Sequence, residues 1–282
     1  RSLLDPGDEV IIFAPYFAEY VFYIEHQGGT ARVAHCGKSF LPDRESLSSC
    51  LTARTKAVLL NSPNNPTGVV YPTETIAEIC EEIRLAEERH GTKICLISDE
   101  AYRRLTFDSI VPPHVFRHHV RSVVAASHSK DLGLAGERIG YLAVNPLWHG
   151  ANEFTDAATF ALRTLGFVNA PAIMQRLVAK IQGASVDVSA YESKRDFLYR
   201  ELTGMGYECV KPTGAFYMFP KSPIQDDLKF VSILQSMLVL TTPGVGFGTP
   251  GHFRIAFSVE DDVLHRSLAA FQAGLEQVLS AG

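Results

Sequence analysis

Short apolar runs alternate with longer amphipathic stretches through roughly the first 180 residues of the chain. The runs Ala57–Leu60 and Ile94–Ile97 are continuous apolar segments, typical of strands that are buried on both faces. The stretches between such runs have the apolar spacing of helices that cover one face of a sheet. This alternation predicts βαβ units around a mostly parallel sheet. We therefore expect an α/β, doubly wound architecture in this part of the chain.

The predicted elements of this part follow one another in a regular order. Strands are expected at Glu9–Phe13, Thr30–Ala34, Thr55–Leu60, Lys93–Ser98, Ser122–Ala126 and Gly140–Val144. Helices are expected at Phe17–His26, Asp43–Leu51, Glu74–His90 and near Gly150–Leu165.

The pattern changes towards the C-terminus, where a smaller α+β unit is expected. The join is predicted to be helical near Gly183, because no linker rich in Gly or Ser separates the two parts. The predicted domains are a large one over residues 1–183 and a small C-terminal one over residues 184–282. Helices are predicted at Asn169–Ile181, Ser185–Met205, Asp227–Leu238 and Asp261–Leu279, and short β pieces at Tyr207–Lys211, Ala215–Phe219 and Phe253–Phe257.

Composition excludes several classes of protein. A net charge of −5 without a long Lys/Arg run argues against nucleic-acid or anionic-membrane binding. No window has the apolar length that a membrane span needs. The five cysteines form no CxxC pattern, which favours free thiols in a reducing, cytoplasmic location and argues against a zinc site.

Because the chain begins at Arg1 and soon reaches a Pro6-Gly7 pair, it is expected to be a piece of a longer protein.

Two polar clusters follow predicted strands, where ligands bind in open α/β sheets. The first, Asn61–Gly68, holds two prolines, a glycine and amide side chains, and its plain interpretation is a strand-to-helix turn. The second, Ser98–Tyr102, places Asp99 at the end of a buried strand, where a carboxylate needs a cation or a donor. A helix N-cap at Asp99 is the alternative. Tyr102 lies on the same side if a helical turn follows.

Two further clusters each contain a cation, one directly after a predicted buried strand and one inside an apolar strand-like run. Lys130 is flanked by Ser127 and Ser129, and these hydroxyls together with Arg138 suit a phosphate. A lysine beside a phosphate site suggests Schiff-base chemistry, although a solvated loop lysine is the usual alternative. Arg254 lies inside an apolar strand-like run and needs a partner, either an internal carboxylate or that of a substrate.

Taken together and in this order, the motifs resemble those of the class I/II aminotransferases. These are pyridoxal 5'-phosphate (PLP) enzymes of the aspartate aminotransferase fold, and the resemblance covers essentially the whole chain. It implies a PLP-dependent transferase fold whose large domain lacks its first segment. The motifs are Pro15-Tyr16-Phe17, Asn65-Pro66-Thr67-Gly68, Asp99-Glu100-Ala101-Tyr102, Ser127-His128-Ser129-Lys130 with Arg138 eight residues on, Gly214-Ala215-Phe216-Tyr217 and Phe253-Arg254.

The resemblance implies a role for each residue around the PLP ring. Lys130 would form the Schiff base and later shuttle the proton. Asp99 would pair with the pyridinium nitrogen, so that the ring acts as an electron sink. Asn65 and Tyr102 would donate hydrogen bonds to the phenolate oxygen of the ring. Phe17 would stack on the ring face.

The resemblance also implies the groups that hold phosphate and substrate. Ser127, Ser129 and Arg138 would hold the phosphate, and Arg254 would clamp the substrate carboxylate, with Asn65 beside it. An L-amino acid would leave its amino group on the cofactor, and a 2-oxo acid would then accept it. A homodimer is implied because family active sites lie at a subunit interface.

The sequence departs from the family pattern in two ways. His128 stands where an aromatic or aliphatic residue is usual, which we expect to be tolerated. The glycine-rich turn that would complete the phosphate site is absent, so weak PLP binding and poor activity are expected of these residues alone. The loop Arg163–Pro171 falls where some dicarboxylate-specific members of the family place a second arginine that reaches the neighbouring subunit's site. Arg163 could have this role, but a surface arginine is the simpler interpretation.

Other functions remain open at this point. The same residues would serve another PLP reaction, such as that of a C–S lyase, a decarboxylase or a cyclopropane-forming synthase. An aminotransferase-like ligand-sensing domain of a transcription regulator is a further alternative, and so is a non-catalytic relative. The sequence does not distinguish aromatic, aliphatic and dicarboxylic amino donors.

Overall fold

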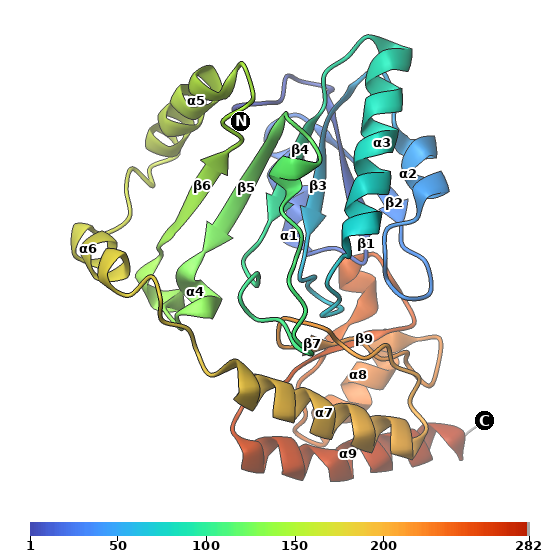
Figure 1. The fold of residues 1–282 in the computed structure, drawn as a ribbon. Helices are drawn as coiled ribbons and strands as arrows, with labels where there is room; N and C mark the ends of the chain where they lie inside the picture. Colours follow the sequence, from blue (N-terminus) through green and yellow to red (C-terminus); the bar gives the residue numbers. More distant parts are fainter. Residues whose placement is uncertain (281–282) are drawn as a thin grey trace.

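The computed structural model describes residues 1–280, and its central feature is a six-stranded sheet (Figure 1). The strand order is β2-β1-β3-β4-β5-β6, in which the first five strands are parallel and β6 is antiparallel to β5. The predicted mostly parallel sheet is therefore confirmed. The strands are β1 (Glu9–Ala14), β2 (Thr30–His35), β3 (Thr55–Asn61), β4 (Cys95–Asp99), β5 (Ser122–Ser127) and β6 (Gly140–Val144).

Helices cover both faces of this sheet, as expected of a doubly wound fold. Ile11 and Phe13 of β1 belong to one apolar cluster, which includes residues of α2 and α3. Val10 and Ile12 belong to a second cluster, which includes residues of α1. Alternate side chains of one strand thus enter opposite layers. The helices of this part are α1 (Glu19–Glu25), α2 (Arg44–Cys50), α3 (Thr73–His90), α4 (His128–Asp131), α5 (Ala151–Thr164) and α6 (Ala172–Lys180), with short 3-10 turns at Val115–Arg117 and Ala135–Glu137.

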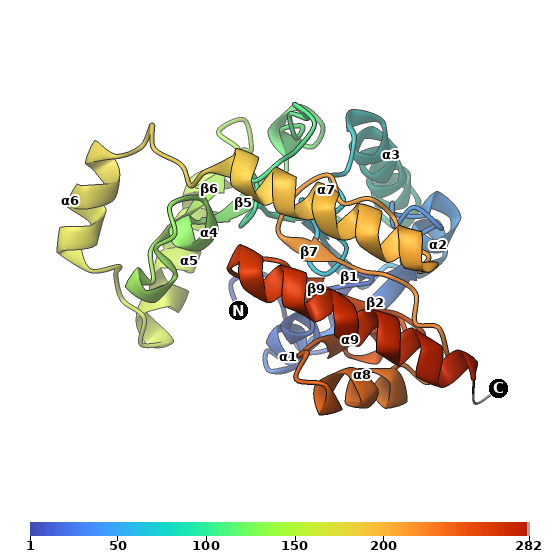
Figure 2. The same cartoon turned by 90° about the horizontal axis from the view of Figure 1, so that it is seen from below.

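The rest of the chain builds a second, antiparallel sheet of three short strands in the order β7-β9-β8. Its own apolar cluster includes Leu198, Phe230, Phe253 and Phe271. Figure 2 shows α7 and α9 running side by side beneath this sheet. The elements are α7 (Val188–Met205), β7 (Tyr217–Met218), α8 (Asp227–Ser236), β8 (Thr242–Pro243), a 3-10 turn (Gly244–Phe247), β9 (Phe253–Ala256) and α9 (Asp261–Leu279).

Two predictions about local structure were wrong. The segment Tyr207–Lys211 is not a strand, because Tyr207 packs as a core side chain whose hydroxyl donates to the carbonyl of Phe271 at 2.9 Å. The region around Gly183 is not helical. There α6 ends at Lys180, and α7 begins only after Asp187, whose carboxylate accepts hydrogen bonds from the first turn.

In the part of the chain that the structure describes, no helix is long and apolar enough to cross a membrane.

Candidate active site

The carboxyl ends of β3, β4 and β5 lie next to one another. In the parallel register Asn61 pairs with Asp99, and Asp99 pairs with Ala125. The loops after these strands therefore begin at one edge of the sheet, where ligands bind in open α/β folds. Three of the four polar clusters predicted from the sequence leave the sheet at this edge.

Asp99 is a half-buried residue, and opposing effects set the pKa of its carboxyl. Burial raises its pKa, while hydrogen bonds from Tyr20 and from the Ala101 amide lower it. The Tyr20 hydroxyl donates to Oδ2 of Asp99 at 2.5 Å, and the Ala101 amide donates to Oδ1 at 3.2 Å. The sequence allowed Asp99 to be a simple helix N-cap. In the structure it also accepts a hydrogen bond from the side chain of Tyr20 on α1.

Tyr20 was not identified from the sequence as a site residue. It is nine-tenths or more buried on α1, and its pKa is raised well above the ordinary value by burial and by Asp99. Phe17, three residues earlier, packs edge-on against its ring at 5.4 Å between centroids. The i, i+3 spacing on a helix was the one signal that could have placed Tyr20 beside Phe17.

Asn65, Tyr102 and Arg254 meet around Tyr217. The hydroxyls of Tyr102 and Tyr217 are 2.8 Å apart, and burial raises the pKa of Tyr102. Nη1 of Arg254 donates to Oδ1 of Asn65 at 2.8 Å. The guanidinium of Arg254 lies 4.6 Å from the centre of the Tyr217 ring and 4.9 Å from that of Phe247. Strand β9 thus contributes Arg254 to the same region as the loops of the large sheet.

Arg254 has no carboxylate partner among the ion pairs of residues 1–280, and its Nε is buried without a hydrogen-bond partner. A guanidinium has five N–H donors, and Asn65 and Thr242 accept from only two of its atoms. The internal salt bridge considered for this residue is therefore not formed. The remaining donors suit an anion from outside the chain.

Lys130 lies in the short helix α4, directly after β5. Burial lowers the pKa of its ammonium group, and the charges of Arg138 and Arg254 lower it further. Its Nζ lies 5.5 Å from the centre of the Phe216 ring. Lys130 is thus only partly exposed and lies close to two other cations.

The hydroxyls beside Lys130 form a compact turn. Ser127 caps α4 by accepting from the Ser129 amide at 3.1 Å, and its own hydroxyl donates to that of Ser129 at 2.7 Å. Arg138 is exposed, has a positive φ of 50°, and donates to the carbonyl of Ala135 at 3.0 Å. Its charge is close enough to affect Lys130.

Two other residues that the sequence singled out lie away from this group. His128 is buried, and its Nδ1 lies 3.2 Å from Oδ2 of Asp131. Arg163 is an exposed residue of the last turn of α5. Within residues 1–280, no cluster of three or more His, Cys, Asp or Glu is placed to hold a metal ion.

Comparison with known proteins agrees with this arrangement. The sequence profile described as "Aminotransferase class I and II" matches residues 1–271. An aspartate aminotransferase of Thermotoga maritima is 35% identical over 274 residues, which are 95% of this chain and 69% of that protein. An aspartate/prephenate aminotransferase of Thermus thermophilus is 32% identical, with 96% of this chain and 70% of that protein covered.

Solved structures show the same fold. An aminotransferase from Eubacterium rectale superimposes with a TM-score of 0.94 and 37% identity over 98% of this chain and 70% of that one. The aspartate aminotransferase from Thermotoga maritima gives 0.85 and 32% identity, with 98% and 72% covered. Profile, sequence identity and fold agree over nearly the full length of the chain, which therefore belongs to the class I and II aminotransferases.

Proposed function

We propose that the chain binds PLP covalently through Lys130 and transfers the amino group of an L-amino acid to a 2-oxo acid. The observation that carries this proposal is the environment of Lys130. Burial and two nearby guanidinium groups lower the pKa of its amine, and only a neutral amine attacks a carbonyl carbon. An ordinary solvated loop lysine has no such environment.

The residues around Lys130 fit PLP by their chemistry. Ser127, Ser129 and Arg138 lie in the segment that follows β5, and their two hydroxyls and guanidinium are groups that suit a phosphate. Asp99 offers a half-buried carboxyl to the pyridine nitrogen. PLP, when bound, supplies the electron sink that stabilises the negative charge formed at the substrate Cα.

Further residues would complete the ring site. We propose that Asn65 and Tyr102 donate to the phenolic oxygen of the ring and that Phe17 packs on its face. Asn65 already orients its carbonyl oxygen towards Arg254 and so leaves its amide donors for another acceptor. Tyr102 is fixed by its hydrogen bond to Tyr217.

The chain's own residues bind the substrate and move the proton. Arg254 binds the α-carboxylate with its free N–H donors, while Tyr217 and Phe247 flank the guanidinium and limit its contact with water. Lys130 then takes the proton from the substrate Cα. A lysine with a lowered pKa suits this step, since its neutral form is more abundant near neutral pH.

The proposal extends to the substrates, the assembly, the domain division and the location. Aspartate is the first amino donor to test, because several similar relatives are named aspartate aminotransferases. A homodimer is supported by exposed apolar side chains on α5 and α6. The division into domains over 1–183 and 184–282 is supported by two separate sheets and apolar clusters. The free state of all five cysteines favours the cytoplasm.

The visible absorbance spectrum after adding PLP tests this function. The chain should develop a pH-sensitive band, and borohydride should then trap PLP on the peptide that contains Lys130. Lys130→Ala should lose both signals, whereas Lys180→Ala, at an exposed residue, should keep them. Trapping that does not depend on Lys130 would contradict the proposal.

The fate of the amino nitrogen distinguishes the reaction classes. With [15N]aspartate and 2-oxoglutarate, an aminotransferase delivers the label to a new amino acid. A C–S lyase acting on a cysteine-type substrate instead releases ammonia and pyruvate. Release of the label as ammonia would overturn the aminotransferase proposal but not the PLP site.

A further inference from the structure

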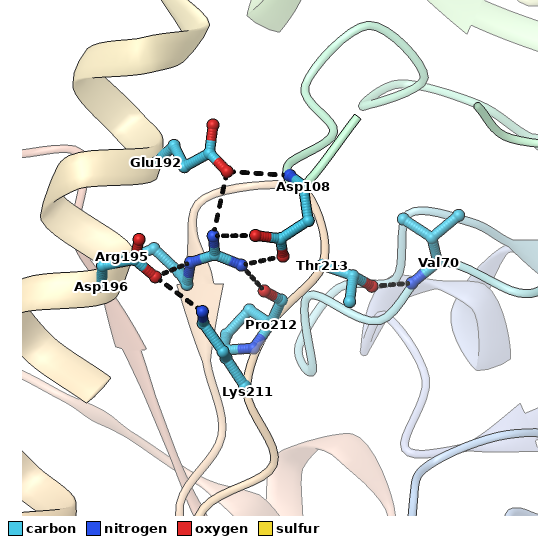
Figure 3. A network of polar contacts seen from close by, with 8 residues as sticks. All are labelled: Val70, Asp108, Glu192, Arg195, Asp196, Lys211, Pro212 and Thr213. Atoms are coloured by element: carbon cyan, nitrogen blue, oxygen red, sulfur yellow. Dashed lines mark hydrogen bonds and ion pairs between the residues drawn. The ribbon is translucent and has the colours of Figure 1, made fainter. Parts of the chain in front are cut away.

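The guanidinium of Arg195 is fully buried, although α7 belongs to the smaller α+β part of the chain. Figure 3 shows the groups that surround it. Its Nη1 donates to the carbonyl of Pro212 at 2.7 Å and to Oδ2 of Asp108 at 2.8 Å. Its Nη2 donates to Oδ1 of Asp108 at 3.0 Å and to Glu192 at 3.2 Å, and Asp196 lies 2.8 Å from Nε.

These contacts fix the loop that follows β4 to α7. The Asp108 amide donates to Glu192 at 2.8 Å, and Asp108 has a positive φ of 54°. The Phe107 amide donates to the carbonyl of Thr213 at 2.9 Å, and the Arg195 guanidinium lies 4.8 Å from the centre of the Phe107 ring. Arg195 therefore contacts both this loop and the segment after Pro212.

The segment after Pro212 is held between two loops of the large sheet. The Thr213 amide donates to the Gly68 carbonyl at 2.9 Å. Figure 3 shows the second contact, in which the Thr213 hydroxyl accepts from the Val70 amide at 2.8 Å. The Ala215 amide donates to the carbonyl of Leu105 at 2.8 Å. The position of this segment thus depends on both loops and on Arg195.

The next two residues of this segment reach the active site. Phe216 packs edge-on against Tyr102 and lies beneath the ammonium group of Lys130. The hydroxyl of Tyr217 is hydrogen-bonded to that of Tyr102, and its ring packs against the guanidinium of Arg254. A shift of the segment would therefore alter the surroundings of Lys130 and Arg254 together.

We infer that Arg195 is a positioning residue for the active site, acting through the segment that carries Phe216 and Tyr217. This inference rests on the proposed function, because it takes Lys130 as the reacting amine. Apolar residues of similar volume often replace a buried ion pair without loss of stability. A planar guanidinium, unlike an apolar side chain, donates hydrogen bonds in fixed directions. Arg195 therefore holds Asp108 and the Pro212 carbonyl in one fixed relative position.

Arg195→Met and Arg195→Lys test the inference, with Arg200→Met as the matched control on the exposed face of the same helix. Hydrogen–deuterium exchange of residues 212–217, which needs no PLP, should speed up at least ~10-fold in both Arg195 variants and remain unchanged in the control. The pH midpoint for reductive methylation of Lys130 should rise, because a displaced Phe216 leaves the amine better solvated. Asp108→Asn keeps Arg195 but removes the charge of its partner, so it should produce a smaller increase in exchange and a smaller rise of the Lys130 midpoint.

In the PLP-loaded protein, kcat should fall at least ~10-fold in Arg195→Met, with less change in the control, since small misplacements of reacting groups are costly. The Arg195 variants could instead lose thermal stability while hydrogen–deuterium exchange of residues 212–217 and the pH midpoint of Lys130 methylation stay unchanged. That result would show that Arg195 is only structural and would overturn the inference. If Arg195→Met does not fold, Arg195→Lys and Asp108→Asn decide by the same readouts. Failure of wild-type protein to form the Lys130-dependent PLP adduct would instead count against the proposed function, and the exchange result would stand separately.

Discussion

At the scale of single residues, burial moves the pKa of Asp99 up and the pKa of Lys130 down, and their neighbours then act in different directions. Burial favours the protonated form of the Asp99 carboxyl and the neutral form of the Lys130 amine. Tyr20 partly opposes this effect at Asp99, whereas Arg138 and Arg254 strengthen it at Lys130. The neighbours of each group thus change its pKa, and perturbed titratable groups that lie together are typical of functional sites.

Tyr20→Phe is expected to destabilise the protein in a pH-dependent way. Loss of a hydrogen bond to a charged group should lower the free energy of unfolding by about 1.5–3 kcal/mol where Asp99 is ionised. Without the hydroxyl, the pKa of Asp99 rises further above its unfolded value. The native state then binds more protons than the unfolded state over a wider interval, and stability falls as pH rises through that interval.

Urea unfolding at about pH 5 and about pH 8 measures this effect, and the loss should be larger at the higher pH. Tyr23→Phe is the matched control, because Tyr23 lies on the same helix with 60% of its surface exposed. An equal loss at both pH values would show that the Tyr20 hydroxyl does not stabilise the ionised form of Asp99.

At the scale of loops and strands, Gly68 allows the loop after β3 to approach the segment that runs from Pro212 to Tyr217. Its φ is +71°, and a Cβ placed there would lie 2.6 Å from the Tyr217 carbonyl and 2.7 Å from Pro212. Both neighbours belong to the segment that carries Phe216 into the site. A side chain at Gly68 would therefore push that segment outward.

Gly68→Ala is expected to lower the free energy of unfolding by about 2–5 kcal/mol, combining left-handed strain with overpacking. Gly91→Ala separates the two causes, because Gly91 has a similar φ of +65° but nothing within 4 Å of a Cβ. It should cost only about 1–2 kcal/mol. Equal losses in chemical denaturation would mean that the close approach at Gly68 does not matter.

Elements with a strong local signal were the ones that the sequence could predict. β3 and β4 are continuous apolar runs, so burial on both faces and the parallel sheet followed from them. The predicted piece Ala215–Phe219 contains β7, whereas the two-residue strand β8 was not predicted, because its pairing with β9 defines it and two residues carry no pattern. Tyr207 has high β propensity, yet packing in the core determines its conformation.

In the candidate site, too, residues with a local sequence signal were predicted and residues defined by tertiary contacts were not. The sequence motifs identified Asp99, Lys130 and Arg254, because charged residues at the ends of apolar strands are conspicuous. Tyr20 and Arg195 were not assigned to the site. Their contribution depends on the carboxylates that α1 and α7 bring them to, Asp99 and Asp108, and no local pattern in the chain encodes those contacts.

At the scale of the whole molecule, apolar side chains gather on the outer helices of the large sheet. Phe160 of α5 is 69% exposed, Ile173 of α6 is 72% exposed, and Phe167 lies between these helices with 71% exposed. Figures 1 and 2 both place α6 at the outer margin of the molecule. Large apolar side chains that stay exposed on these helices are the kind of surface that a partner would cover.

Phe160→Glu combined with Ile173→Glu is therefore expected to convert a dimer into a monomer. Each apolar side chain that an interface covers contributes about 1.5–3 kcal/mol, so two buried charges should weaken the dimer by well over ~100-fold. Light scattering after size exclusion gives the mass, and Leu240→Glu, at a position 80% exposed elsewhere, should leave it unchanged. Because both substitutions lie on the surface, the unfolding free energy of the monomer should change little. A wild-type chain that stays monomeric when concentrated, or a double variant that stays dimeric, would place the partner surface elsewhere or remove the dimer from the proposal.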